Sequence, residues 1–304
     1  MKGEEIIMKK QNPVGKSLYA LRKNRGLSAR EISSGVDPSS ITRFENGHSD
    51  FGVNRLIPVL NESGTDAWEF FQSIHGQPGS LDSLLNRIAV CVHDNDGPSL
   101  DRLAQQELQE YYVGKSRIHR LTSIMVHSVL ISMSHSNDIL SADDSSIIAH
   151  YLLSVKKWYK YEFVLYKNTV PHLDTRLHYE LFAKLLENSP AWEEQSVFQL
   201  YFVEAIQSLT LRLVTNKKYV QAKHLLNKID LSRFPDYDMF IRYKILLFRS
   251  VVNYLASPSE NLKRNIQKVL SLTNVYLDSS VSNKDLAWVQ SLGIQLGINP
   301  VKKA

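Results

Sequence analysis

The chain has 304 residues, of which 43% are hydrophobic and 22% charged, a balance that suits a globular protein with a sizeable core. No apolar run approaches the roughly 20 residues of a membrane span, and the N-terminal MKGEEIIMKKQNP lacks the apolar stretch of a signal peptide. The net charge of +5 is uneven, with 14 Lys or Arg against 6 Asp or Glu in residues 213–304, which fits an ordinary solvated surface, an acidic partner or nucleic acid.

The only cysteine is Cys91, so an intramolecular disulfide is excluded and a reducing, cytoplasmic location is expected. Cys91 stands between Val90 and Val92 on what looks like an apolar helix face. We therefore expect a small buried side chain at this position, not a reactive thiol.

The first 75 residues contain short segments with helical periodicity and little else. The second of these, SAREISS, begins with Ser28 and has Glu31 three residues later, which is the pattern of a capping box. Ser34-Gly35-Val36 then predicts a tight turn. The five helices expected in this part are 14–25, 28–34, 38–46, 53–62 and 66–73.

The third segment, GVDPSSITRFENG, has the signals of a short helix over 38–46. Asp37 can cap its free N–H groups, and a proline at the first helical position loses nothing that it needs. Val36 and Ile41 are placed as a hydrophobic staple, and Gly47 follows the last turn, where a left-handed residue is favoured.

A helical wheel divides this third helix into two faces. Ile41, Phe44 and Glu45 share one face, and the opposite face carries small hydroxyls, an amide and one arginine. In an isolated helix such a face is simply solvated. Two short helices joined by a glycine turn inside a five-helix unit favour a helix-turn-helix DNA reader instead, with these polar groups facing the bases.

The stretch HGQPGS, 75–80, predicts a linker between a domain over 1–74 and a second over 81–304. Beyond it, the sparse Gly and Pro predict helices and no sheet, so the fold class is all-α. Longer and shorter helices alternate at irregular spacing, which indicates stacked hairpins of the tetratricopeptide type. The expected helices are 80–93, 99–112, 115–134, 143–157, 159–169, 172–188, 191–215, 217–229, 236–256, 259–277 and 283–296.

Enzymatic motifs are lacking. Gly15-Lys16-Ser17 and Gly114-Lys115-Ser116 resemble the end of a phosphate-binding loop, but neither has the glycine that should stand five residues earlier. The histidines show no i, i+4 pair on one helix face that would favour a metal. We expect no enzyme, no cofactor and no metal site.

The segment LRKNRGLSAREISSGVDPSSITRFENG, 21–47, resembles the repressor-type (Xre-like) helix-turn-helix. In that family an arginine of the first helix commonly pairs with a glutamate near the end of the recognition helix. The resemblance therefore implies a structural pair of Arg22 and Glu45, with Glu45 turned away from DNA.

Nearly the whole chain resembles the Rgg-type regulators, through FENGHSDFGVNRLIPVLNESGTDAWEFF, 44–71, and KKWYKYEFVLYKN, 156–168. The resemblance implies a cytoplasmic homodimer that binds operator double-stranded DNA and, through its helical repeats, a short hydrophobic signalling peptide, as in quorum sensing. A helical-repeat adaptor, or a regulator that responds to a protein partner or small molecule, remains open. The family often has a glutamine that touches DNA where this chain has Ala29.

The helix faces and the resemblance together give two sets of expected contacts. Those with DNA are Lys16, Arg25, Arg30, Ser39, Ser40, Thr42, Arg43 and Asn46. Those with the peptide, on the longer helices, are His150, Arg176, Tyr179, Gln199, Tyr201, Arg242 and Tyr243. The last helix, with Leu286, Trp288, Val289, Leu292 and Leu296, is expected to form either a dimer surface or a cap of the repeats.

Overall fold

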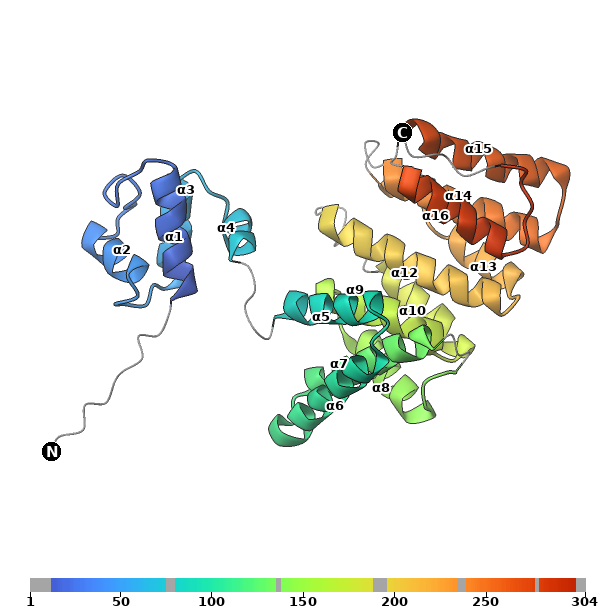
Figure 1. Cartoon of the computed structure of the whole chain (residues 1–304), viewed down its shortest axis with the longest axis horizontal. Helices are drawn as coiled ribbons and strands as arrows, with labels where there is room; N and C mark the ends of the chain where they lie inside the picture. Colours follow the sequence, from blue (N-terminus) through green and yellow to red (C-terminus); the bar gives the residue numbers. More distant parts are fainter. Residues whose placement is uncertain are drawn as a thin grey trace. The chain divides into compact units, whose positions relative to one another are not determined.

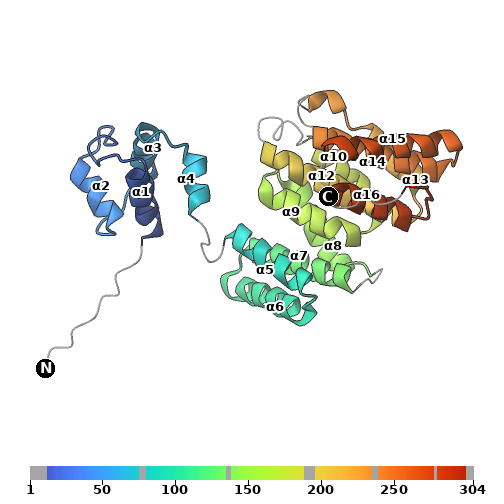
Figure 2. The same ribbon diagram turned by 45° about the horizontal axis from the view of Figure 1, so that its top comes forward.

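The computed structural model describes residues 12–74, 80–134, 138–187, 196–234, 239–276 and 279–298. In these residues the regular secondary structure is all helical and there is no strand, in agreement with the expected all-α class (Figures 1 and 2). It divides into two compact units, Met1–Arg87 and Ile88–Ala304. The expected linker 75–80 lies outside the described residues except for Ser80, so that domain boundary stays a prediction.

The first unit is built from four helices around one small core. They are α1 (Pro13–Asn24), α2 (Pro38–Glu45), α3 (Val53–Glu62) and α4 (Ala67–Ser73). Every one of them contributes to the core, whose buried members are Leu18, Ile32, Ile41, Phe44, Leu56, Val59, Leu60 and Phe70.

Segment 28–34 is not the helix that the sequence predicts. Its backbone makes successive turns, with Glu31 N–H donating to the Ser28 carbonyl and Ser33 N–H to the Arg30 carbonyl. The capping signal is satisfied without a helix, because Ser28 and Glu31 bond each other's backbone N–H groups. The segment still buries Ile32 completely, so it performs the packing that a helix would have performed.

Helix α1 lies very close to the end of α2. Asn12 caps α1 by accepting from Gly15 N–H at 3.0 Å, and its amide donates to the Phe44 carbonyl at 3.4 Å. A Cβ on Gly15 would lie 2.2 Å from that carbonyl oxygen. Glycine is therefore required here by the packing of two helices.

The second unit is an all-helical array that runs to the C-terminal end of the chain. Helices α6 and α7 lie side by side as a hairpin, and α14, α15 and α16 lie together (Figures 1 and 2). Its α-helices are α5 (Leu81–His93), which crosses the division between the units, α6 (Gly97–Gly114), α7 (Arg117–Met133), α8 (Ala142–Ser154), α9 (Lys160–Thr169), α10 (Thr175–Glu187), α12 (Ser196–Thr215), α13 (Tyr219–Asn227), α14 (Met239–Ala256), α15 (Glu260–Tyr276) and α16 (Ser279–Ser291), with the short 3₁₀ turns η1 (Val170–His172) and η2 (Leu231–Arg233).

The final helix begins and ends earlier than the 283–296 expected. Gly293 has a φ of +78°, a left-handed conformation that ends α16, and the following residues return non-helically to the core. Leu286, Val289 and Leu296 are buried in a cluster with α14 and α15. Trp288 and Leu292 are partly buried against the same cluster, and the choice between a dimer surface and a cap of the repeats stays a prediction.

Helix α5 also differs from expectation. Cys91 is only partly buried, and its neighbours Val90 and Val92 are 58% and 43% exposed. In α5 only Ile88 is fully buried, so the apolar side of this helix is weakly covered. Within the described ranges, no helix combines the length and the apolar character needed to cross a membrane.

Candidate nucleic-acid interface and ligand-binding residues

The orientation of α2 follows from its ends and its buried face. Asp37 accepts from Ser39 N–H and caps the helix, and the hydroxyl and backbone hydrogen bonds from Ser39 lower the pKa of Asp37. Ile41, Phe44 and Glu45 are buried against the rest of the unit. This fixes which side of the helix remains exposed to a partner.

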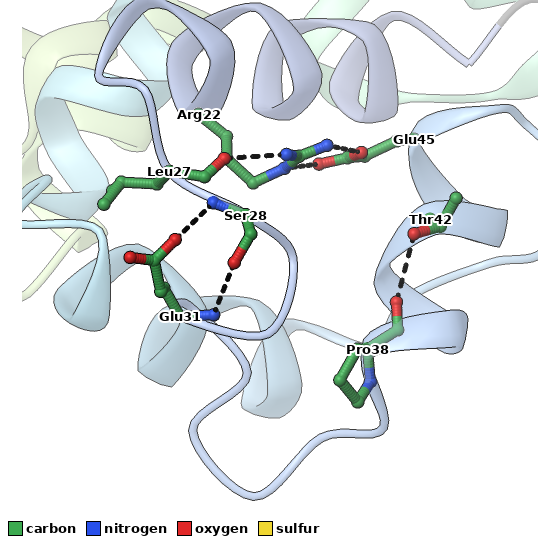
Figure 3. Close-up of polar contacts among 7 residues, drawn as sticks. All are labelled: Arg22, Leu27, Ser28, Glu31, Pro38, Thr42 and Glu45. Atoms are coloured by element: carbon green, nitrogen blue, oxygen red, sulfur yellow. Dashed lines mark hydrogen bonds and ion pairs between the residues drawn. The ribbon is translucent and has the colours of Figure 1, made fainter.

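A buried ion pair holds the end of α2 to α1 (Figure 3). Arg22 donates from Nε to Glu45 Oε1 at 2.8 Å and from Nη2 to Oε2 at 2.6 Å. The exposed fractions of the two side chains are 7% and 1%. The hydrogen bonds to Glu45 raise the pKa of Arg22, although burial opposes this, so the guanidinium stays charged.

Arg22 also fixes the turn that precedes α2. Its Nη1 donates to the Leu27 carbonyl at 2.8 Å, and residue 28 starts the turns that lead to α2 (Figure 3). One guanidinium thereby joins α1, the connecting segment and α2. The joint is stiff because a forked guanidinium–carboxylate pair fixes both distance and direction.

The exposed face of α2 carries groups able to read DNA. Thr42 Oγ1 donates to the Pro38 carbonyl at 3.2 Å, and Ser39 Oγ donates to Asp37 at 2.6 Å, so each hydroxyl oxygen keeps lone pairs for a base amino group. Arg43 and Asn46 are exposed, and neither side chain has a partner among the described residues. Arginine pairs well with guanine, and asparagine with adenine.

The other expected DNA contacts divide into exposed and engaged side chains. Lys16 and Arg30 are exposed, and Ser40 is partly buried. Arg25 instead donates to the Ser63 carbonyl and to Thr65 Oγ1, so its guanidinium is committed to the loop between α3 and α4. Sequence reasoning missed this, because the loop lies about 40 residues further along the chain.

The expected peptide contacts have different surroundings. His150 is exposed, and Arg176 is exposed but paired with Asp174. Tyr243 was expected to contact the peptide, but it is buried, and its hydroxyl donates to Asp285 at 2.9 Å inside the C-terminal core. Arg242 is held by the Phe234 carbonyl at 2.7 Å.

The remaining three candidates lie on α10 and α12. Tyr179 is partly buried beside the ring of His224, and Tyr201 is partly buried under the ammonium of Lys160. The side chain of Gln199 lies outside the described residues. The described residues hold no group of three or more His, Cys, Asp or Glu side chains suited to a metal ion.

A model of the family described as "HTH-type transcriptional regulator Rgg, C-terminal domain" matches residues 104–284, which is more than half of the chain. The chain belongs to the Rgg family. The membership comes from the helical-repeat unit, and it agrees with the helix-turn-helix pattern found independently in the first unit.

Solved structures share this Rgg-type fold across nearly the whole chain. The SHP pheromone receptor Rgg2 of Streptococcus dysgalactiae has a TM-score of 0.71 at 17% identity, covering 91% of this chain and 99% of that one. A protein of Listeria monocytogenes EGD-e gives 0.73 at 16%, covering 93% and 99%. The PrgX/cCF10 complex gives 0.65 at 12%, covering 92% and 99%. At these identities the likeness establishes the fold alone.

Two polar features of the Rgg repeat unit escaped the sequence reasoning. Lys167 of α9 pairs with Glu204 of α12 at 2.6 Å, which joins helices distant in sequence. The second feature is a group of partly or wholly buried basic side chains around Arg212 of α12. Their sequence spacing gives no signal, and in the structure α12 packs against η1, which carries His172.

Proposed function

We propose that this Rgg-family chain is a cytoplasmic, homodimeric transcription regulator that reads operator DNA with the exposed face of α2 and responds to a short hydrophobic signalling peptide through its repeat unit. The observation that carries the DNA half is the sidedness of α2. Glu45 is buried on Arg22, while Arg43, two residues away, is exposed without a partner among the described residues.

In this proposal α2 enters the major groove and divides the work among its residues. Arg43 supplies the bidentate donor suited to guanine, while Ser39, Thr42 and Asn46 bond to base edges or phosphates. Lys16, Arg30 and Ser40 contact the phosphate backbone of the DNA in this proposal. Arg25 is left out, because its guanidinium is engaged within the unit.

Substitution of Arg43 by alanine tests the DNA half. We expect Arg43→Ala to lose about 1–3 kcal/mol of discrimination between operator and mutated operator, with the fold unchanged, because a bidentate base contact disappears. A band-shift assay on the DNA upstream of its own gene measures this. Arg264→Ala, which removes the same charge from an exposed site of α15, is the matched control. Unchanged specificity in Arg43→Ala would refute the proposed reading role.

The peptide half rests on the family and on the fold shared with a pheromone receptor and with the PrgX/cCF10 complex. A concave face of stacked helices can hold an extended peptide through side chains such as His150, Arg176, Tyr179 and Tyr201. Calorimetric titration with synthetic hydrophobic peptides encoded near the gene tests it. A peptide that binds should also change the band shift, and a small molecule or protein that does so instead would contradict the peptide assignment.

A further inference from the structure

Helix α6 packs one of its sides into the repeat unit and leaves the other side open. The inner side buries Leu100 and Leu103, and the Ala104 carbonyl accepts from Ser123 Oγ of α7 at 2.9 Å. The helix lies at the edge of the second unit in both views (Figures 1 and 2). At about 100° per residue, one arc of roughly 120° on the open side collects six exposed side chains, which we call the outer face. They are Asp101, Arg102, Gln105, Gln109, Tyr112 and Val113.

The C-terminal end of the outer face is apolar. Val113 is 85% exposed, the highest value among the large hydrophobic side chains that the structure describes, and Tyr112 beside it is 60% exposed. Ile118, just beyond the turn into α7, is exposed as well. A single exposed apolar side chain is common on a protein surface, but a group of them marks a surface for interaction.

The two ends of α6 carry opposite charges. Lys115 follows the apolar end with its ammonium 5.6 Å from the centroid of the Tyr112 ring, and Arg117 is exposed two residues later. At the other end Asp94 and Asp101 are exposed. Since Asp101 and Lys115 lie roughly 20 Å apart along the helix axis, they do not pair within one chain.

A second copy of α6 that runs antiparallel to the first complements this arrangement. In a two-fold contact, residue i of one copy meets residue j of the other, and j meets i. With the axis at the middle of α6, Asp101 lies beside the partner's Lys115, and Arg102 lies opposite the partner's Tyr112. Both contacts occur twice, and arginine packs well on a tyrosine ring. DNA fits this face less well, because one of its ends is acidic.

We infer that the outer face of α6, with Lys115 at its end, is a contact between two copies of this chain, paired antiparallel about a two-fold axis. The inference rests on the proposed homodimer and deepens it by naming a surface through which the copies meet. The contact buries the most exposed valine of the described residues and joins opposite charges at both of its ends.

Sedimentation velocity of the full chain over a range of concentrations measures the Kd of the dimer. We expect Val113→Glu to raise this Kd about tenfold or more, because a charge enters an apolar contact and faces the partner's Asp101. Val220→Glu on α13, which changes a valine that is 77% exposed, is the matched control and should leave the Kd unchanged. Since both valines are exposed, the circular dichroism spectra should not change.

An exchange of charges tests the pairing of the copies directly. Asp101→Lys and Lys115→Glu should each raise the Kd of the homodimer about three- to tenfold, because like charges then meet twice in every dimer. Fluorescently labelled Asp101→Lys should bind Lys115→Glu with a Kd near that of the unaltered dimer, since both contacts again join opposite charges. It should bind the control variant Arg264→Glu, altered at an exposed site of α15, more weakly.

Each other outcome counts against the α6 contact. If Val113→Glu leaves the Kd unchanged, or if the two charge variants do not complement each other, the interface lies elsewhere and the proposed homodimer stands. A lower melting temperature of Val113→Glu with an unchanged Kd would show that the chain covers α6 by itself. An unaltered chain that stays monomeric would refute the homodimer together with the contact.

Discussion

At the scale of single residues, the buried pair of Arg22 and Glu45 is the feature that most constrains the DNA-binding unit. Both charges are almost fully withdrawn from water, and each is satisfied by the other. Such a pair adds little to the free energy of unfolding compared with a well-packed apolar pair. Removing only one of the two partners is costly, because the other charge is left buried and unpaired.

Single and double substitutions of this pair should therefore differ sharply. We expect Glu45→Leu to lower the free energy of unfolding of the first unit by about 3–5 kcal/mol, because Arg22 is left charged and buried. The double variant Arg22→Met, Glu45→Leu should recover much of that loss. Urea unfolding of the full chain measures both. Additive losses in the double variant would show that the two residues do not interact energetically.

His178 gives a prediction about acid. The unfolded chain takes up a proton near pH 6.5, and the folded chain does so only near pH 4. Stability is therefore complete above pH 6.5 and falls as the pH drops towards 4, by on the order of 3 kcal/mol in total. We expect the His178→Phe variant to lose less stability between pH 7 and pH 5 than the unaltered chain, as measured by urea unfolding. An equal slope in both chains would contradict a buried neutral His178.

At the scale of elements, the first unit depends on how closely α1 approaches α2. Gly15→Ala should destabilise the first unit by about 1–3 kcal/mol, because its Cβ would collide with the Phe44 carbonyl, which as backbone can move only with α2. Gly114→Ala, where a Cβ meets nothing within 4 Å, is the matched control and should be neutral or stabilising. The melting temperatures of the two variants, measured by circular dichroism, distinguish these effects. Equal melting temperatures would mean that α2 shifts without cost.

Most helices could be predicted from periodicity and breakers, because these patterns reflect burial on one side of a helix. Segment 28–34 could not, since its capping signal is equally well satisfied by turns. The engagement of Arg25 and the burial of Tyr243 depend on residues about 40 positions away, which local patterns do not reveal. The contact of Arg22 with Glu45 was expected only through the family resemblance, because spacing alone does not pair them.

At the scale of the whole molecule, the Rgg family and the proposed homodimer predict the form of the operator. Two copies related by a two-fold axis should read an inverted repeat, with half-sites separated by about 10–10.5 base pairs or a multiple. Nuclease footprinting should show two protected half-sites, and affinity should fall steeply with salt as phosphate contacts release counterions. Protection of a single half-site would contradict the dimer.

The position of Glu45 on α2 has a consequence for redesign. The side chains proposed to read bases occupy one side of this helix, and the glutamate that locks the helix to α1 occupies the other. We therefore expect that exchanging Ser39, Thr42, Arg43 and Asn46 alone retargets the operator preference. A helix transferred whole from another regulator would need an acidic residue at position 45. Without it, Arg22 would be buried without a partner for its charge.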